Sequence, residues 1–125
     1  MTLAIVDDDA DVRKGLGRLM RSLGHDVSSF ASGEEFERDT VVVDCAIVDV
    51  RLPGASGLEL AVRLRRRRPS VPVVLITGDA EPVDPDALQA SGAVLVTKPF
   101  DDVRLIAAMS EAVAAASSAG RTYVL

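Results

Sequence analysis

Charged side chains stand where three short apolar runs of this sequence end. The first run precedes Asp7, Asp8 and Asp9. Asp49 ends the second run, and Lys98 comes just after the third. Runs of this length with β-branched residues are typical of buried strands, and in a parallel sheet ligand chemistry collects beyond the carboxyl ends of the strands. We therefore expect these groups to converge at one edge, where they would bind a divalent cation and then a phosphoryl group.

The chemistry of such a site follows from its side chains. Oxygen ligands alone favour a hard cation, and a small number of protein ligands favours Mg²⁺ over Ca²⁺. Lys98 would supply a counter-charge for the phosphoryl group, and Thr77 offers a hydroxyl at the end of a further apolar run. His25 is expected in a turn at the opposite end of the sheet and Cys45 within a strand, so neither would recruit zinc.

Each of these residues also has an ordinary structural explanation. Consecutive aspartates often cap a helix, and Asp49 alone could be a loop carboxylate. Threonine and lysine residues such as Thr77 and Lys98 more often pack or face solvent than form a site. The coincidence of such side chains at four strand ends favours the site over these separate explanations.

Alternating strands and helices would position these side chains. The expected strands lie at residues 3–7, 26–30, 45–49, 71–76 and 93–97. Apolar residues at helical spacing mark a first helix at residues 12–23, and capping boxes at residues 32–35 and 56–59 open the second and third helices. A proline in its first turn marks the fourth helix at residues 84–91, and the fifth is expected at residues 101–116. The fourth helix should be short because Gly92 follows it.

Strict alternation predicts an α/β fold with a doubly wound, five-stranded parallel sheet and helices on both faces. The common order for five strands is 2-1-3-4-5, the flavodoxin-like order, with its switch point between the first and third strands. Asp7 and Asp8 end the first strand and Asp49 ends the third, so the carboxylates fall at this crevice. We expect one domain at residues 1–116 and a tail at residues 117–125.

Composition and charge exclude several other classes of protein. The chain of 125 residues is 48% apolar with a net charge of −5, which disfavours disorder and nucleic acid binding. Its apolar runs and its first residues lead us to expect neither a membrane span nor a secretory signal. Its single cysteine, Cys45, fits a small core side chain in a reducing compartment. A cytoplasmic protein is therefore expected. Arg63 and residues 65–68 should form a solvated helix end, where cations complement the dipole.

The sequence resembles the receiver domain of two-component response regulators over residues 2–116. The motifs that carry the resemblance occur in order, at residues 5–9, 49–57, 76–78 and 98–100. The Ile76-Thr77-Gly78 segment and Arg51 are most similar to regulators of the nitrogen-fixation (LuxR-type) branch.

The resemblance implies a phosphoacceptor rather than an enzyme, with self-phosphorylation and autodephosphorylation only. Asp49 would accept a phosphoryl group from the phosphohistidine of a sensor histidine kinase or a histidine phosphotransfer protein. Asp8 and Asp49 would bind Mg²⁺ directly with the backbone carbonyl oxygen of Arg51, and Asp7 would act through water. We expect a receiver without an output domain.

The resemblance also implies a conformational switch. Thr77 and Lys98 would contact phosphoryl oxygens, the Lys98–Pro99 peptide would be cis, and a two-state equilibrium of the fourth and fifth elements would shift. Many receivers carry Tyr or Phe three residues before the lysine, whereas this sequence has Leu95, so the aromatic part of the switch is missing.

Two further expectations concern the lifetime of the phosphoryl group and self-association. Arg51 and Asp79 would flank the path of the attacking water, and an ion pair between them should let the phosphoryl group persist for minutes or longer rather than seconds. The fifth helix has extra apolar residues, including Val103 and Ile106, which indicate either a broad buried face or a homodimer or docking face.

Alternatives from other classes remain open at this point. An aspartate-nucleophile phosphatase would use the spacing within Asp7-Asp8-Asp9 but needs room for a substrate cap. A pure interaction module would have no need of Asp49, Thr77 and Lys98 together. A nucleotide-binding domain is disfavoured because no glycine-rich loop follows the first strand.

Overall fold

A computed structural model describes residues 1–78 and 82–121, with side chains as far as residue 116. Within these residues strands and helices alternate strictly. The strands are β1 (Thr2–Val6), β2 (Asp26–Phe30), β3 (Cys45–Asp49), β4 (Val73–Thr77) and β5 (Val94–Thr97). The helices are α1 (Ala10–Ser22), α2 (Gly33–Arg38), α3 (Gly57–Arg67), α4 (Pro85–Ser91) and α5 (Asp102–Arg121).

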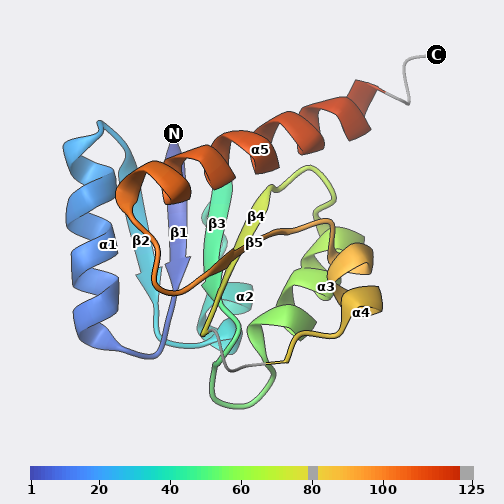
Figure 1. Cartoon of the computed structure of the whole chain (residues 1–125), viewed down its shortest axis with the longest axis horizontal. Coiled ribbons are helices and arrows are strands. Elements are labelled where there is room, and N and C mark those ends of the chain that lie inside the picture. The colour runs from blue at the N-terminus through green and yellow to red at the C-terminus, as the bar shows by residue number, and fades with distance from the viewer. Residues whose placement is uncertain (79–81, 122–125) are drawn as a thin grey trace.

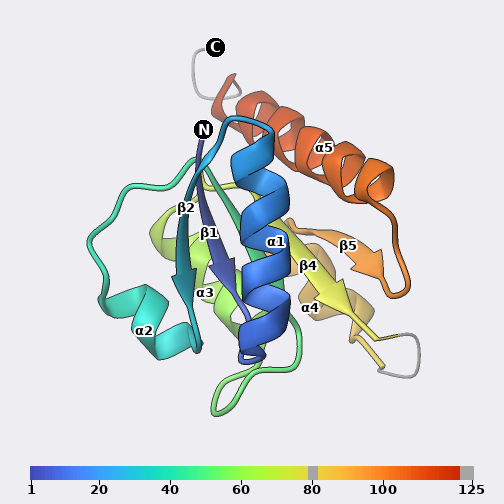
Figure 2. The same ribbon diagram turned by 90° about the vertical axis from the view of Figure 1, so that its left-hand side faces the viewer.

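All strands pair in parallel in the order β2-β1-β3-β4-β5, which confirms the predicted α/β fold and strand order. Helices α1 and α5 cover one face of the sheet, and α2, α3 and α4 cover the other (Figure 1 and Figure 2). Successive strand residues point to opposite faces of the sheet and so form two hydrophobic cores. Leu3 and Ile47 belong to one core, and Ala4 and Val48 belong to the other. The carboxyl ends of the strands therefore share one edge.

Most predicted strand ends agree with the structure within one residue, and two element boundaries differ by more. β4 begins at Val73 rather than at residue 71, because Pro72 has no N–H for the ladder; its carbonyl oxygen instead accepts from Ala46 at 2.9 Å. α5 reaches Arg121, so the predicted helix end at residue 116 is wrong. Alanine and serine continue the helix at little cost, and Gly120 costs only about 1 kcal/mol. Residues 122–125 of the predicted tail lie outside the described residues, and the division into domain and tail stays a prediction.

Side chains cap the starts of four helices. Each cap oxygen accepts a backbone N–H of the first turn: Asp9 before α1, Ser32 before α2, Ser56 before α3 and Asp84 before α4. α4 ends at Gly92, whose φ of +66° is the left-handed conformation that glycine adopts freely. The predicted N-caps at Ser32, Ser56 and Asp84 and the short fourth helix are thus confirmed.

The basic end of α3 is occupied by contacts within the chain. Glu37 of α2 pairs with Arg63 at 2.5 Å and with Arg67 at 3.2 Å. The Arg68 guanidinium lies 6.0 Å from the centre of the Phe36 ring. These contacts fasten α3 to α2, which supports a structural role for the cluster.

Two residues excluded from the site lie where the sequence predicts. Cys45 is fully buried in β3, and burial raises the pKa of its thiol to about 11. His25 comes directly before β2, at the edge opposite the aspartates. In the described part of the chain, no helix has the length and apolar character needed to span a membrane.

Candidate functional site

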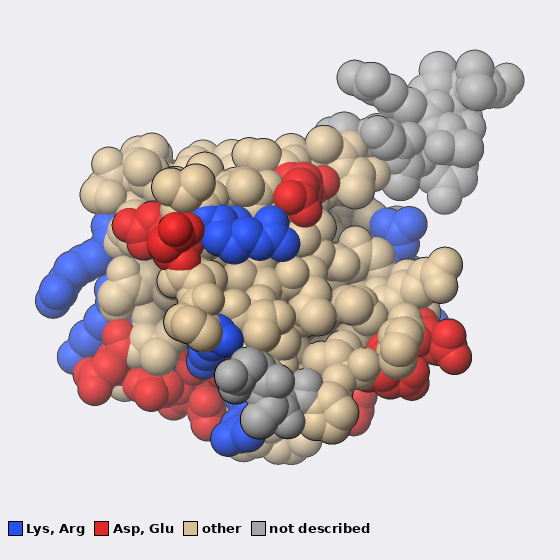
Figure 3. Space-filling model, viewed as in Figure 1, with Lys and Arg blue, Asp and Glu red and all other residues tan. Residues whose placement is uncertain are grey.

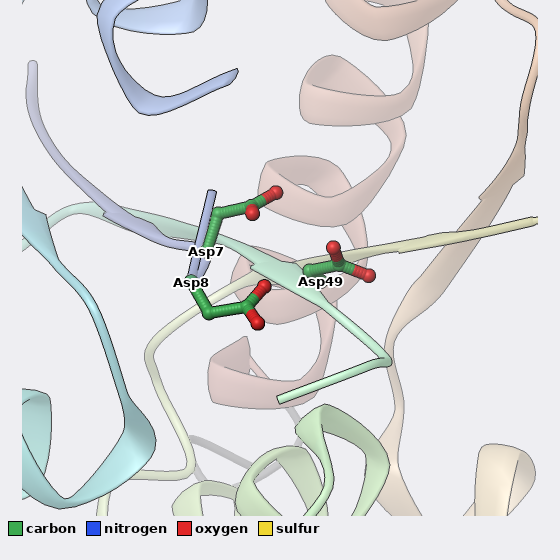
Figure 4. A group of neighbouring side chains, drawn as sticks. All are labelled: Asp7, Asp8 and Asp49. Atoms are coloured by element: carbon green, nitrogen blue, oxygen red, sulfur yellow. The ribbon is translucent and has the colours of Figure 1, made fainter. Parts of the chain in front are cut away.

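Three carboxylates meet at the carboxyl edge of the sheet. Asp7 and Asp8 directly follow β1 and Asp49 ends β3, and an oxygen atom from each lies within 4.8 Å of the others. Figure 4 shows the side chains of Asp7 and Asp8 on the side of Asp49. Asp7 and Asp49 are buried, with 2% and 8% of their surface exposed, whereas Asp8 is open to solvent. The fold therefore brings together the aspartates that the sequence assigns to one site.

Backbone hydrogen bonds orient the two buried carboxylates. The Asp9 N–H donates to Asp7 Oδ1 at 2.9 Å, and the Arg51 N–H donates to Asp49 Oδ1 at 3.0 Å. The other oxygen of Asp49, Oδ2, lies 3.9 Å from Lys98 Nζ. Asp9 itself caps α1 and does not belong to the carboxylate cluster. The run of aspartates therefore divides into site residues and a helix cap.

A buried carboxylate among other carboxylates is costly to ionise. Burial raises the pKa of Asp7, and the negative charge of Asp49 raises it further. The N–H of Asp9 and the ammonium group of Lys98 oppose this change, and the resulting pKa of Asp7 is about 6. A cation among these side chains would favour the ionised form and remove the cost.

Lys98 and Thr77 lie at the same edge of the sheet. Thr77 ends β4, and the residue before it is in register with Asp49. The Lys98 N–H donates to the Thr77 carbonyl oxygen at 2.8 Å, and the Lys98–Pro99 peptide is cis, as the resemblance implied. Thr77 is 3% exposed, and its hydroxyl donates to the Gly78 carbonyl oxygen at 3.3 Å. A hydroxyl and an ammonium group thus stand beside the carboxylates.

α3 approaches the end of β3 closely because residue 57 is glycine. A Cβ on Gly57 would lie 1.9 Å from the carbonyl oxygen of Asp49 and 3.0 Å from Val48 Cγ1. The Gly57 N–H donates to the Val50 carbonyl oxygen at 2.9 Å. The Val50 N–H in turn donates to the Ile76 carbonyl oxygen at 2.8 Å. The turn after Asp49 is therefore held between α3 and β4. The capping sequence does not reveal this contact, and the only sequence signal is a glycine directly after the capping serine.

The donor set of the carboxylate cluster fits Mg²⁺. The candidate ligands are oxygen atoms, and ligands on opposite sides of Mg²⁺ lie about 4 Å apart, near the observed separation within 4.8 Å. Asp7, Asp8 and Asp49 would hold the ion, directly or through water. No histidine or cysteine among the described residues joins this cluster, so zinc is disfavoured.

Two other predicted residues have different outcomes. Asp79 lies outside the described residues, and so does its predicted ion pair with Arg51. Leu95, in the position where many receivers carry an aromatic ring, packs against the core under α3 and α4. The Leu95 carbonyl oxygen accepts a hydrogen bond from Arg104 of α5 at 3.3 Å, which ties β5 to α5.

Comparison with known proteins gives a family match over most of the chain. The family model described as the response regulator receiver domain matches residues 3–110. The chain is 36% identical over 108 residues to nodulation protein W of Bradyrhizobium diazoefficiens, which covers 84% of this chain and 48% of that protein. It is also 36% identical over 120 residues to the transcriptional regulatory protein FixJ of Azorhizobium caulinodans, covering 94% of this chain and 57% of that one. The chain therefore spans about half the length of these relatives.

The structural comparison agrees with the sequence comparison. The structure of the response regulator StyR superimposes with a TM-score of 0.82 at 31% identity. The match covers 98% of this chain and 63% of the StyR chain.

Proposed function

The chain belongs to the response regulator receiver domain family, and we propose that Asp49 accepts a phosphoryl group from a phosphohistidine. The observation that carries the proposal is the meeting of three carboxylates with Lys98, whose Nζ lies 3.9 Å from Asp49 Oδ2. The donor would be a sensor histidine kinase or a histidine phosphotransfer protein. In this role the chain is a signalling domain rather than an enzyme that turns over a separate substrate.

Positioning and charge neutralisation would account for most of the catalysis. The Arg51 N–H holds Asp49 Oδ1, which leaves Oδ2 as the attacking atom. A bond forms between Oδ2 and phosphorus as the bond from phosphorus to the imidazole nitrogen of the donor breaks. Lys98 would neutralise charge on an equatorial phosphoryl oxygen. Mg²⁺ held by the aspartate cluster would neutralise further charge when bound.

Phosphorylation would shift the structure of α4 and β5 through Thr77. The Thr77 hydroxyl, which donates to Gly78, would donate to a phosphoryl oxygen instead. Because the Lys98 N–H binds the Thr77 carbonyl oxygen at 2.8 Å, the ends of β4 and β5 would respond together. A shift from 1:99 to 99:1 requires about 5.5 kcal/mol in favour of the active state. With Leu95 in the aromatic position, Thr77 would carry most of this coupling.

The proposal extends to a homodimer through α5. Val103 and Ile106 on this helix are 75% and 39% exposed, which leaves apolar surface for a partner. Ile106→Glu should weaken self-association without unfolding the protein. Light scattering before and after phosphorylation measures this effect, and a monomer under both conditions would contradict the dimer.

Phosphorylation of the purified chain tests the central assignment. Incubation with Mg²⁺ and a small phosphodonor, followed by intact mass measurement, should show the addition of one phosphoryl group to the wild type. Asp49→Asn should show none, because its amide is nearly isosteric but cannot attack. Asp44→Asn, directly before β3 and exposed, is the matched control and should label normally. Equal labelling of Asp49→Asn and wild type would overturn the assignment.

A further inference from the structure

We propose that a basic hollow between α1 and β2 binds a small tetrahedral oxyanion of the phosphate class, independently of the phosphoacceptor site. The hollow has a volume of about 170 Å³ and is lined by Ala10, Arg13, Lys14, Arg21 and Ser29. None of these residues belongs to the aspartate cluster. The proposal therefore does not depend on phosphorylation of the chain.

The cations of α1 lack carboxylate partners. In the part of the chain that the structure describes, Arg13, Lys14, Arg18 and Arg21 form no ion pair, although acidic residues outnumber basic ones by 19 to 14. Lysine and arginine side chains gather along the edge of the molecule that α1 forms (Figure 3). Three like charges at one hollow repel each other, and a bound anion would remove that repulsion.

A hydrogen bond fixes one guanidinium group at the hollow, and a glycine leaves room for the other. Arg13 Nη1 donates to the carbonyl oxygen of Asp7 at 2.6 Å, which fixes this side chain to the end of β1. Arg21 lies over Gly17, where a Cβ would be only 3.1 Å from Arg21 Nη1. Gly17 stands one helical turn from each arginine, so its missing side chain gives Arg21 room along the helix. The prior placement of Arg13 lowers the entropic cost of binding an anion.

The lining side chains favour a tetrahedral oxyanion over other anions. A guanidinium group can bind two phosphate oxygens at once, and an ammonium group adds a point charge. Ser29 of β2 adds a hydroxyl donor, and no carboxylate lines the hollow. A volume of about 170 Å³ is below the roughly 300–1,000 Å³ of sites for larger ligands. The hollow therefore suits inorganic phosphate or the phosphoryl group of a small molecule.

An NMR titration of the whole chain with inorganic phosphate tests this proposal. The titration is made in EDTA at constant ionic strength, so that the metal-free aspartate cluster repels the anion. We expect saturable shifts of the Ala10 and Ser29 amide signals. Arg21→Gln should weaken binding by about tenfold, as expected for loss of a charge-assisted hydrogen bond. Arg18→Gln removes the same charge from the same helix outside the hollow and should leave the affinity within about twofold.

The outcomes separate a site from general charge attraction. Shifts that do not saturate, or equal weakening by Arg21→Gln and Arg18→Gln, would overturn the proposal. A parallel titration with glycerol phosphate identifies the source of the phosphoryl chemistry. Tighter binding of glycerol phosphate would support a phosphorylated small molecule as the ligand, and tighter binding of inorganic phosphate would support the free ion.

Discussion

Asp7→Asn should stabilise the metal-free protein near neutral pH. Asp7 is 2% exposed, and burial raises its pKa from 3.8 to about 6. Asparagine retains an oxygen that can accept the Asp9 N–H, but it has no charge to bury. The substitution therefore removes an electrostatic cost and leaves the local hydrogen bond in place.

The size of the effect follows from the two pKa values of Asp7. Between pH 3.8 and about 6, the folded protein retains a proton on Asp7 that the unfolded chain has released. The stability contributed by this group therefore falls as the pH rises through that interval. A difference of about two pKa units corresponds to about 3 kcal/mol. Asp7→Asn should thus match wild type below about pH 4 and exceed its free energy of unfolding by about 3 kcal/mol at about pH 7.

Urea unfolding in EDTA, followed by circular dichroism at several pH values, measures the difference. Asp9→Asn is the matched control, because asparagine caps a helix about as well as aspartate and the change should cost less than about 1 kcal/mol. In EDTA-free buffer, Mg²⁺ at 100 times its dissociation constant should stabilise wild type by about 2.7 kcal/mol. A difference that is constant with pH, or an Asp7→Asn protein less stable than wild type in EDTA at about pH 7, would refute this explanation.

Four other substitutions test the surrounding structure. Gly57→Ala places a Cβ 1.9 Å from the Asp49 carbonyl oxygen, so it should lower the free energy of unfolding by about 3 kcal/mol and slow phosphorylation, measured by urea unfolding and intact mass. Glu37→Gln should cost about 1–2 kcal/mol because its side chain, 19% exposed, binds two arginines. Glu111→Gln, in a pair with 43% and 56% exposure, should cost less than about 1 kcal/mol in the same assay, and equal costs would contradict the reasoning. Thr77→Ala should still be phosphorylated but should lose the accompanying NMR shifts of α4 and β5; a normal response would exclude the Thr77 hydroxyl from the switch.

The convergence of the aspartates could be predicted because it depends only on strand order and direction. Neighbouring parallel strands lie about 4.8 Å apart, so side chains at the ends of adjacent strands must approach one another. Asp7 directly follows β1, Asp49 is the last residue of β3, and β1 pairs directly with β3. Any sheet in the 2-1-3-4-5 order brings these two residues together, whatever the details of helix packing.

Contacts that depend on helix packing could not be predicted in the same way. Nothing in the local sequence shows that Gly57 meets the peptide of Asp49, since that distance depends on how α3 lies on the sheet. Glu37 likewise pairs with two arginines of α3, and this pairing also depends on how the helices pack. The sequence also does not show which of the three consecutive aspartates belong to the site and which one caps a helix, because both roles use the same side chain. Asp9 accepts N–H groups of the first turn of α1 because this helix begins directly after it.

Arg13 connects the two charged regions of the molecule. Its guanidinium group binds the carbonyl oxygen of Asp7, whose carboxylate belongs to the aspartate cluster. The positive charge of Arg13 opposes a cation at the cluster, and an anion in the basic hollow would offset that charge. Phosphate in the hollow should therefore strengthen Mg²⁺ binding, and linkage requires Mg²⁺ to strengthen phosphate binding by the same factor. Because Arg21 lines the hollow and does not belong to the cluster, Arg21→Gln should weaken this coupling while leaving the Mg²⁺ ligands intact.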